Sequence, residues 1–354
     1  MRILLFLFFS VCCFVVKAQS NASIIPRDYV AYKAKQEILV DGQAKETSWE
    51  KASWSEDFID IEGQTKPTYQ TRMKMLWDDE YLYIMAQMEE PHVWANLKQK
   101  DTIIFYNNDF EVFIDPDGDT HNYYEFEFNA LNTVWDMFLT RPYRGDNEAI
   151  NDFDINGLKS AIHVDGTLNN YNDEDKGWTI EIAIPWSTFR TSYMQDIVPV
   201  DQFWRVNFSR VNWNFEIVNN AYTRKKDKNG KYLHEFNWVW SPTGVINMHE
   251  PEKWAYVFFS SKHVGENIQF EVPVDEKIKW ELYKLYRSQI QYFEKNENWA
   301  TDLSLLNPKP IIIEGQTLNA QLESHSMGWN LIIKSPFSGK ILVVKENGQF
   351  VVKD

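Results

Sequence analysis

Residues 108–129, NDFEVFIDPDGDTHNYYEFEFN, hold the densest group of side chains able to do chemistry in this chain. Asp109 and Glu111 alternate with apolar residues, and Glu125 and Glu127 do so again after an acidic turn. Because side chains alternate across a strand, these acids should share one face of a hairpin whose other face is apolar. Carboxylates beside aromatic rings suit a sugar-binding surface or a metal site.

The turn between the two runs is a candidate calcium site. Asp115, Asp117 and Asp119 follow each other at every second position, and calcium takes six to eight oxygen ligands. The spacing is similar to that of an EF-hand loop, but the glycine, Gly118, is at position 4 instead of 6. The turn is therefore no EF-hand, and a structural calcium ion and a solvated acidic turn both stay open.

The strand acids suggest a second kind of site. Glu111, Glu125 and Glu127 would line a polar face and bind ligand hydroxyls. Three neighbouring acids raise each other's pKa, so cations should lie nearby. Arg205 and Arg210, in the run 203–213, could supply them. A structural ion-pair network is the alternative to a binding site.

Composition narrows the class of ligand. The 354 residues carry a formal net charge of −15, which would repel the phosphates of nucleic acids and anionic membranes. Fifteen Trp and seventeen Tyr exceed the usual need of a core. Their flat apolar faces and polar edges match sugar rings, although any single Trp can equally be part of the core.

The first 18 residues resemble a signal peptide. Arg2 precedes an apolar run, Ile3–Val16, and Val16-Lys17-Ala18 suggests cleavage before Gln19. An uncleaved anchor and a lipidated cysteine are the alternatives. Both cysteines lie in this leader, so the mature chain would contain none and would rely on a large core or a bound metal. We expect a secreted or periplasmic protein of the bacterial cell envelope, with no membrane span after cleavage.

The next region, up to about residue 265, has the pattern of an all-β domain. Short runs rich in β-branched and aromatic residues alternate with Gly, Pro, Asn and Asp clusters, which is typical of a sandwich or barrel. The expected strands are 71–77, 81–88, 110–114, 123–129, 134–139, 162–165, 178–184, 203–213 and 255–259. Short helical turns are expected at 47–52 and 185–189.

After Pro273 the pattern changes. Residues 275–298 have apolar side chains at a period close to 3.6, which predicts a helix. Residues 311–313, 329–334, 340–344 and 350–352 predict strands, with a hairpin turn at 345–348. The chain therefore divides into residues 1–18, a domain at 19–265, and a C-terminal helix and β-hairpin subdomain at 266–354. That subdomain could pack on the domain before it or tether it to another molecule.

Four ordered motifs resemble family 9 carbohydrate-binding modules. They are Val40-Asp-Gly42 followed by Trp49, Trp54 and the run 71–83; the strand 108–115; Gly177-Trp-Thr-Ile-Glu-Ile-Ala-Ile-Pro-Trp186; and Pro251-Glu-Lys-Trp-Ala-Tyr256. The resemblance covers about residues 38–260 and is closest to secreted bacterial family 9-like proteins that have no attached catalytic domain. It implies an antiparallel, jelly-roll-like β-sandwich with bound calcium that holds the end of a sugar chain between two aromatic rings.

The resemblance also implies site residues. The two clamping rings of the family fall near Phe105 and Met248, its hydrogen-bonding glutamate corresponds to Glu111, and an arginine corresponds to Glu127, which inverts the charge. With the aromatic candidates added, the expected ligand-binding set is Trp94, Phe105, Glu111, Glu125, Glu127, Trp135, Arg205, Arg210, Trp213, Trp240 and Met248.

Three functions are compatible with these patterns. The first is a secreted, non-catalytic carbohydrate-binding protein that takes a poly- or oligosaccharide and works with other glycan-degrading proteins. The second is a hydrolase of O-glycosyl bonds using two of the glutamates, although no pair has a distinguishing spacing. The third is a structural or interaction protein whose sandwich has lost sugar binding. Of the seven histidines, only His92 and His249 are candidates for lining a cleft.

Overall fold

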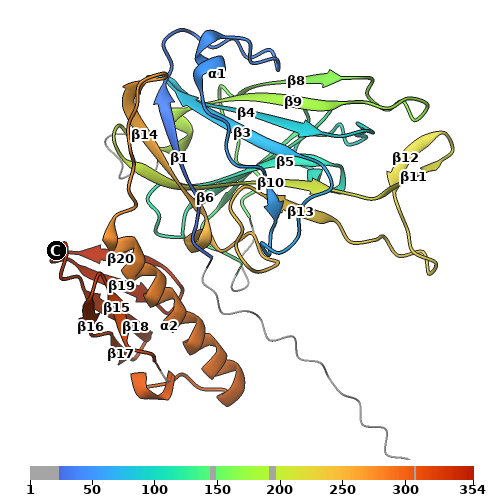
Figure 1. Ribbon diagram of the computed structural model, residues 1–354. Coiled ribbons are helices and arrows are strands. Elements are labelled where there is room, and N and C mark those ends of the chain that lie inside the picture. Colours follow the sequence, from blue (N-terminus) through green and yellow to red (C-terminus); the bar gives the residue numbers. More distant parts are fainter. Residues whose placement is uncertain (1–23, 144–148, 191–196, 307) are drawn as a thin grey trace, which may run out of the picture.

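The computed structural model describes residues 24–143, 149–190, 197–306 and 308–354. The expected signal peptide, residues 1–18, lies outside this part. Between residues 28 and 263 the chain is mostly β (Figure 1). Its strands are β1 (Asp28–Lys33), β2 (Ile59–Asp60), β3 (Thr71–Trp77), β4 (Tyr81–Glu89), β5 (Asp109–Asp115), β6 (Tyr123–Asn129), β7 (Val134–Leu139), β8 (Lys159–Asp165), β9 (Gly177–Pro185), β10 (Phe203–Asn212), β11 (Phe215–Val218), β12 (Ala221–Arg224), β13 (Phe236–Val239) and β14 (Ala255–His263).

Ten of these strands form a continuous path in the order β7-β6-β5-β10-β14-β1-β3-β4-β9-β8, and β13 joins β10 to β2. The sheet curls so that its two halves face one another as in a sandwich, which confirms the expected all-β class (Figure 1). It is not wholly antiparallel. Strand β1, which the sequence patterns missed, runs parallel to both β14 and β3. No tight hairpin joins β1 to either neighbour, so nothing forces the antiparallel direction.

The core lies between the two halves. Phe110, Val112 and Ile114 of β5 pack there against residues of β9 such as Ile180 and Ile182, all almost fully buried. The alternation of apolar and polar residues in β5 and β6 therefore places one face in the core, as the sequence predicts. The acidic face is largely buried as well, because every residue of both strands has little exposed surface.

Short helical segments connect the strands. They are α1 (Thr47–Lys51), η1 (Ile104–Tyr106), η2 (Trp186–Phe189) and η3 (Pro251–Lys253). The first and third match the helical turns expected from the sequence. Segment η1 leads directly into β5 and carries Phe105 to the edge of its acidic face.

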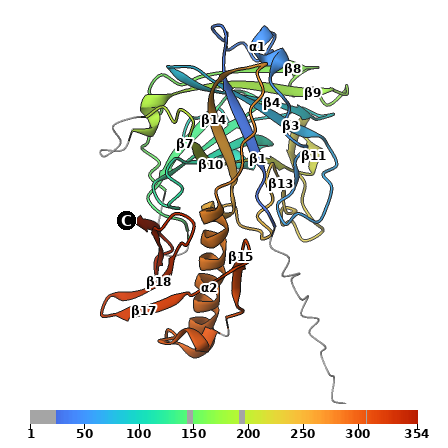
Figure 2. The ribbon, with the colours of Figure 1, turned by 60° about the vertical axis from the view of Figure 1, so that its left-hand side comes forward.

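The C-terminal subdomain lies beside one end of the sandwich (Figure 2). Helix α2 (Val274–Asn296) and segment η4 (Leu303–Leu306) precede strands β15 (Ile311–Ile313), β16 (Gln316–Leu318), β17 (Gln321–His325), β18 (Gly328–Lys334), β19 (Ile341–Lys345) and β20 (Phe350–Lys353). Ile278 and Leu282 of the helix pack on Trp329 and Leu331 in a core separate from that of the sandwich. The expected helix and strands are confirmed; β16 and β17 were missed because most of their residues are polar. No helix among the described residues is long and apolar enough to cross a membrane.

Candidate functional site

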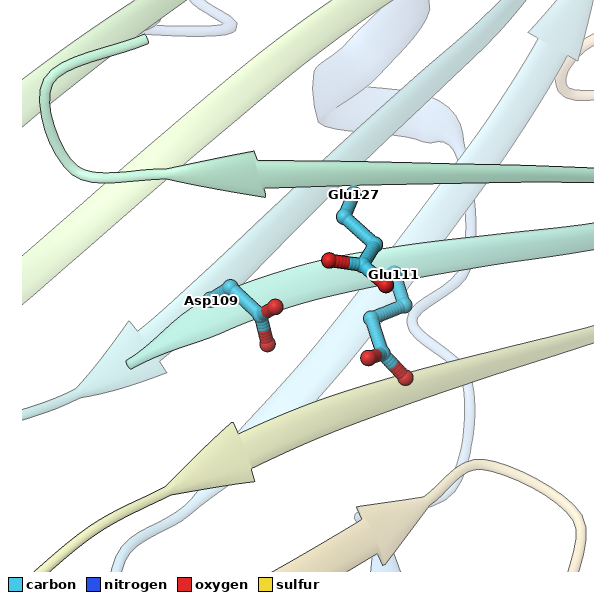
Figure 3. Close-up of side chains that lie close together, drawn as sticks. All are labelled: Asp109, Glu111 and Glu127. Atoms are coloured by element: carbon cyan, nitrogen blue, oxygen red, sulfur yellow. The ribbon is translucent and has the colours of Figure 1, made fainter. Parts of the chain in front are cut away.

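The pairing of β5 with β6 gathers the strand acids on one face. Glu111 lies opposite Glu127, and Phe113 lies opposite Glu125. Asp109 is two residues before Glu111 and therefore points to the same side. Figure 3 shows Asp109 and Glu111 on one strand and Glu127 on the next, with their carboxylates directed toward one another. The acidic group therefore forms because of the pairing register of β5 and β6, and not only because its residues are close in the sequence.

A cavity of about 320 Å³ opens over this face. Its volume is at the lower end of the range for small-molecule sites, about 300–1,000 Å³. Four carboxylates, several aromatic rings and a loop close to β14 line it. The lining residues are Ile61, Phe105, Glu111, Phe113, Glu125, Glu127, Trp135, Met137, Tyr143, Val211, Glu235, Asn237, Ile246, Asn247, Met248 and His249. A second hollow, of about 290 Å³ and lined mainly by polar residues of β3, β4, β8 and β9, lacks such a cluster of acids.

Burial and like charges perturb the acids of the cavity. Burial is the main cause that raises the pKa of Glu111 to about 7, and a hydrogen bond with Ser209 opposes it. Burial also raises the pKa values of Asp109, Glu125 and Glu127 well above their usual range, and the charge of Glu111 adds to each shift. Carboxylates with such values in a cleft are typical of functional sites.

His249 closes one side of the cavity. Its Nε2 lies 3.9 Å from a carboxylate oxygen of Glu125, and its Nδ1 is 2.8 Å from the Tyr123 hydroxyl. Tyr143 packs edge-on against its ring, with the centroids 4.4 Å apart. Burial lowers the pKa of His249 to about 4, so the ring is neutral near pH 7. It therefore offers polar nitrogen atoms but no counter-charge to the acids.

The cavity brings together six of the expected ligand-binding residues. They are Phe105, Glu111, Glu125, Glu127, Trp135 and Met248. Phe105 and Trp135 are partly accessible, so a ring face can meet a ligand. The backbone amide of Phe105 donates to Glu127 at 2.9 Å, which ties the aromatic segment to the acidic group. The positions of these six residues in the cavity are the same whichever of the acids are ionised.

The other five residues are not among those lining the cavity. Trp94 and Trp240 are almost completely buried, and Trp213 is only 5% exposed, so the structure does not offer these rings as binding platforms. Arg210 alternates with Ser209 and points to the opposite face, where it pairs with Glu90 at 3.4 Å. Arg205 pairs with Glu276 of α2 at 3.1 Å. The expectation that these arginines accompany the glutamates is therefore wrong.

Sequence reasoning missed several lining residues. Glu235 and Asn237 come from the segment around β13, and Tyr143 and Asn247 come from loops. None of these residues belongs to a recognisable sequence motif, and only the folded chain places them at the cavity. His249 was anticipated, whereas His92 contacts Tyr222 and Phe215 at another place.

The acidic turn also assembles. Oxygen atoms of Asp115, Asp117 and Asp119 lie within 4.8 Å of one another, which suits a shared cation. Both carboxylate oxygens of Asp115 already accept backbone amides, from Gly118 and Thr120 at 2.9 Å. The turn also has a cationic neighbour, because the buried Lys279 ammonium donates to the Gly118 carbonyl. The donor set fits calcium, but a fixed ammonium already offsets part of its charge.

The chain thus contains a β-sandwich with a cavity that acidic and aromatic side chains line. Residues 40–203 match the family described as carbohydrate family 9 binding domain-like. This segment, a little less than half of the chain, is similar to that family. It includes β3 to β9, and therefore most of the acidic face; Met248, His249 and the C-terminal subdomain lie outside it.

Two enzymes are similar to the chain over part of their length. An exoglucanase of Acetivibrio thermocellus is 22% identical over 283 residues, which is 78% of this chain and 20% of the enzyme. The endo-1,4-beta-xylanase A of Thermoanaerobacterium saccharolyticum is 28% identical over 119 residues, 34% of this chain and 8% of the enzyme. The chain thus matches a fifth or less of the length of these relatives.

One solved structure aligns with much of the chain. It is a family 9 carbohydrate-binding module from Caldicellulosiruptor kristjanssonii in complex with cellotriose. It is 14% identical, with a TM-score of 0.39, and the alignment covers 69% of this chain and all of the module.

Proposed function

We propose that the protein is a secreted, non-catalytic carbohydrate-binding protein that recognises a poly- or oligosaccharide in the cavity over β5 and β6. The observation that carries this proposal is the combination in one cavity of partly accessible rings, Phe105 and Trp135, with the carboxylates of Glu111 and Glu127. Rings stack on the C–H face of a sugar, and carboxylates accept hydrogen bonds from its hydroxyls. The family of residues 40–203 supports this class of ligand.

The residues of the cavity divide the work of recognition. Phe105 and Trp135 supply apolar faces. Glu111, Glu125 and Glu127 supply acceptors whose direction is fixed by the sheet, so little freedom is lost on binding. Met248 supplies an apolar contact where the family resemblance places a ring, which gives a softer and more adaptable wall. We infer that the cavity tolerates more than one sugar geometry.

Calorimetric titration of the full chain against a panel of neutral and acidic glycans tests the proposal. Binding is expected for at least one glycan in the presence of calcium. Trp135→Ala should weaken it about 10-fold or more, the loss of one stacking contact of about 1.5 kcal/mol. Trp54→Ala is the matched control, because Trp54 is also half-buried but lies outside the cavity, under Arg72. Absence of heat with every glycan would overturn the proposal.

The non-catalytic part of the proposal has its own test. Glycosidases place two carboxyl groups about 5–5.5 Å or 6.5–9.5 Å apart on either side of the scissile bond. Here Asp109, Glu111 and Glu127 each place one carboxylate oxygen within 4.8 Å of the others, closer than either of these separations, and we take this spacing to favour binding. We expect no release of reducing sugar from any glycan that binds. Release that is lost in Glu111→Gln would favour the hydrolase instead.

Calcium at Asp115, Asp117 and Asp119 is a further part of the proposal, with a structural role. An ion that binds only the folded state raises the apparent melting temperature. Chelation should therefore lower the melting temperature of the wild type, and the shift should shrink in the Asp117→Asn/Asp119→Asn double variant. Export of the full-length chain into the periplasm or medium, followed by N-terminal sequencing of the product, tests the signal peptide.

A further inference from the structure

A second group of acids is independent of the turn: Glu111 and Glu127 line the cavity, and Asp109 lies beside them. We call these three residues the cavity floor. Oxygen atoms of Asp109, Glu111 and Glu127 all lie within 4.8 Å of one another (Figure 3). Two ligands on opposite sides of one calcium ion are about 4.6–5.2 Å apart, since each Ca–O distance is about 2.3–2.6 Å. One ion can thus reach all three carboxylates without moving a strand.

The burial of this group requires a partner for its charge. Asp109 is 0% exposed, Glu127 2% and Glu111 6%. Asp109 accepts the Val211 amide at 3.1 Å through Oδ1, but its Oδ2 is buried and has no hydrogen-bond partner. A buried carboxylate oxygen without a partner is costly, and a charged one more so. The unpaired oxygen belongs to the side chain that is directed toward the other two carboxylates.

Protein cations do not supply that partner. Among the described residues, no ion pair connects Asp109, Glu111 or Glu127 to a lysine or arginine. Arg210 influences the pKa of Asp109 through its charge, yet it is held on the other face by Glu90 and Thr71. His249, which lines the cavity, lies against Glu125 and is neutral near pH 7.

We propose that Asp109, Glu111 and Glu127 bind a divalent cation of the calcium class at the floor of the cavity. The three carboxylates supply at least three of its six to eight oxygens, and the unpaired Asp109 Oδ2 becomes a ligand. Glu111 and Glu127 also line the cavity, so the remaining positions face the space where a ligand enters. This ion is distinct from any ion at the Asp115 turn.

If the proposed sugar binding holds, the cation can also take part in binding the sugar. Two neighbouring hydroxyls of a sugar are hard oxygen donors, and they can replace water on an ion of this type. The cation would then link the acidic floor to the sugar and reverse the effect of the negative charge at Glu127. Recognition of a hydroxyl pair would therefore depend on calcium.

Calcium titration into the chelator-treated full chain, without sugar, tests the site. Calcium binding is expected in the wild type and in Asp79→Asn, a control whose side chain is exposed and distant. Asp109→Asn/Glu127→Gln should weaken binding of the ion at the cavity floor at least about 10-fold and leave any ion at the turn in place, because it removes two of three charged ligands at the floor while keeping their shape. Circular dichroism and melting in chelator verify that this double variant folds.

Two results would overturn the assignment. One is a calcium titration that gives no heat with folded wild type. The other is binding that Asp109→Asn/Glu127→Gln leaves intact and Asp117→Asn/Asp119→Asn removes, which would place the only ion at the turn. Glycan titration with calcium and with chelator then tests the sugar link: loss of glycan binding in chelator supports it, and equal binding refutes it. Absence of glycan binding alone contradicts the proposed function but not the metal site.

Discussion

Two clusters of three acids lie on the same hairpin and differ in how their oxygens are used. In the turn, both oxygens of Asp115 accept backbone amides, and Lys279 contributes a positive charge. At the cavity floor, Asp109 has an oxygen without a partner, and no lysine or arginine pairs with the group among the described residues. The two clusters contain the same number of carboxylates, but of the two, within the described part of the chain, only the cavity floor has a buried carboxylate oxygen without a hydrogen-bond partner.

The acidic turn has a structural role, because the C-terminal subdomain packs against it. The Asp119 carbonyl accepts the Phe350 amide at 3.0 Å, and its carboxylate accepts the Gln349 side chain at 2.7 Å. Thr120 donates to the Gly348 carbonyl at 3.0 Å. Together with Lys279 of α2, these contacts hold the helix and the hairpin 345–350 against the acidic turn. The subdomain therefore packs on the sandwich, one of the two arrangements that the sequence left open.

The same substitution in the two clusters should have opposite effects. Asp115→Asn loses one of two amide acceptors and leaves a buried N–H unpaired, so the free energy of unfolding should fall by about 1–3 kcal/mol. Asp109→Asn keeps the acceptor for Val211 and replaces the unpaired oxygen by a donor. In chelator its stability should be unchanged or about 1 kcal/mol higher. Urea denaturation measures both.

Asp79→Asn is the control for this pair, because its exposed side chain should change stability by no more than about 0.5 kcal/mol. Equal losses in Asp109→Asn and Asp115→Asn would contradict the distinction between the clusters.

Local patterns predicted the hairpin and its faces, because a period of two directly encodes which side chains share a face. The same rule shows that Arg205 and Arg210, five residues apart, point to opposite faces of β10, so at most one of them could accompany the glutamates. The burial of Trp94 and Trp240 could not be predicted, since it depends on which loops and strands cover them. The partner of Arg205 could not be predicted either, because it comes from α2, 71 residues further along the chain.

Substitution at the contact between the acidic turn and α2 should have the next largest effect on stability. Lys279 is 2% exposed, so Lys279→Met keeps the apolar stem but removes the donor to Gly118 and the charge near Asp115. Stability should fall by about 1–2 kcal/mol in urea denaturation. Lys277→Met is the matched control on the same helix. Its pair with Glu314 is solvent-accessible and should contribute less than about 1 kcal/mol. Similar losses in both variants would show that the turn does not depend on Lys279.

The cavity floor should also reveal itself through the pH dependence of stability in chelator. The pKa of Glu111 is raised to about 7 in the folded state, and those of Asp109 and Glu127 are raised too. A group whose pKa is higher in the folded state stabilises at low pH, and that contribution is lost as the pH rises through the folded value. The metal-free protein should therefore melt at a higher temperature at pH 6.5 than at pH 8.

The comparison is limited to pH 6.5–8 because the titration of His249 changes stability in the opposite direction below pH 6.5. Its pKa is lowered to about 4, so it destabilises the fold as the pH falls below 6.5, where the unfolded chain takes up a proton. Asp109→Asn/Glu127→Gln should flatten the slope between pH 6.5 and 8, since fewer buried acids remain to titrate. Calcium should flatten it in the wild type, because the ion binds the deprotonated acids most tightly at high pH. A slope unaffected by both changes would place its origin outside the cavity floor.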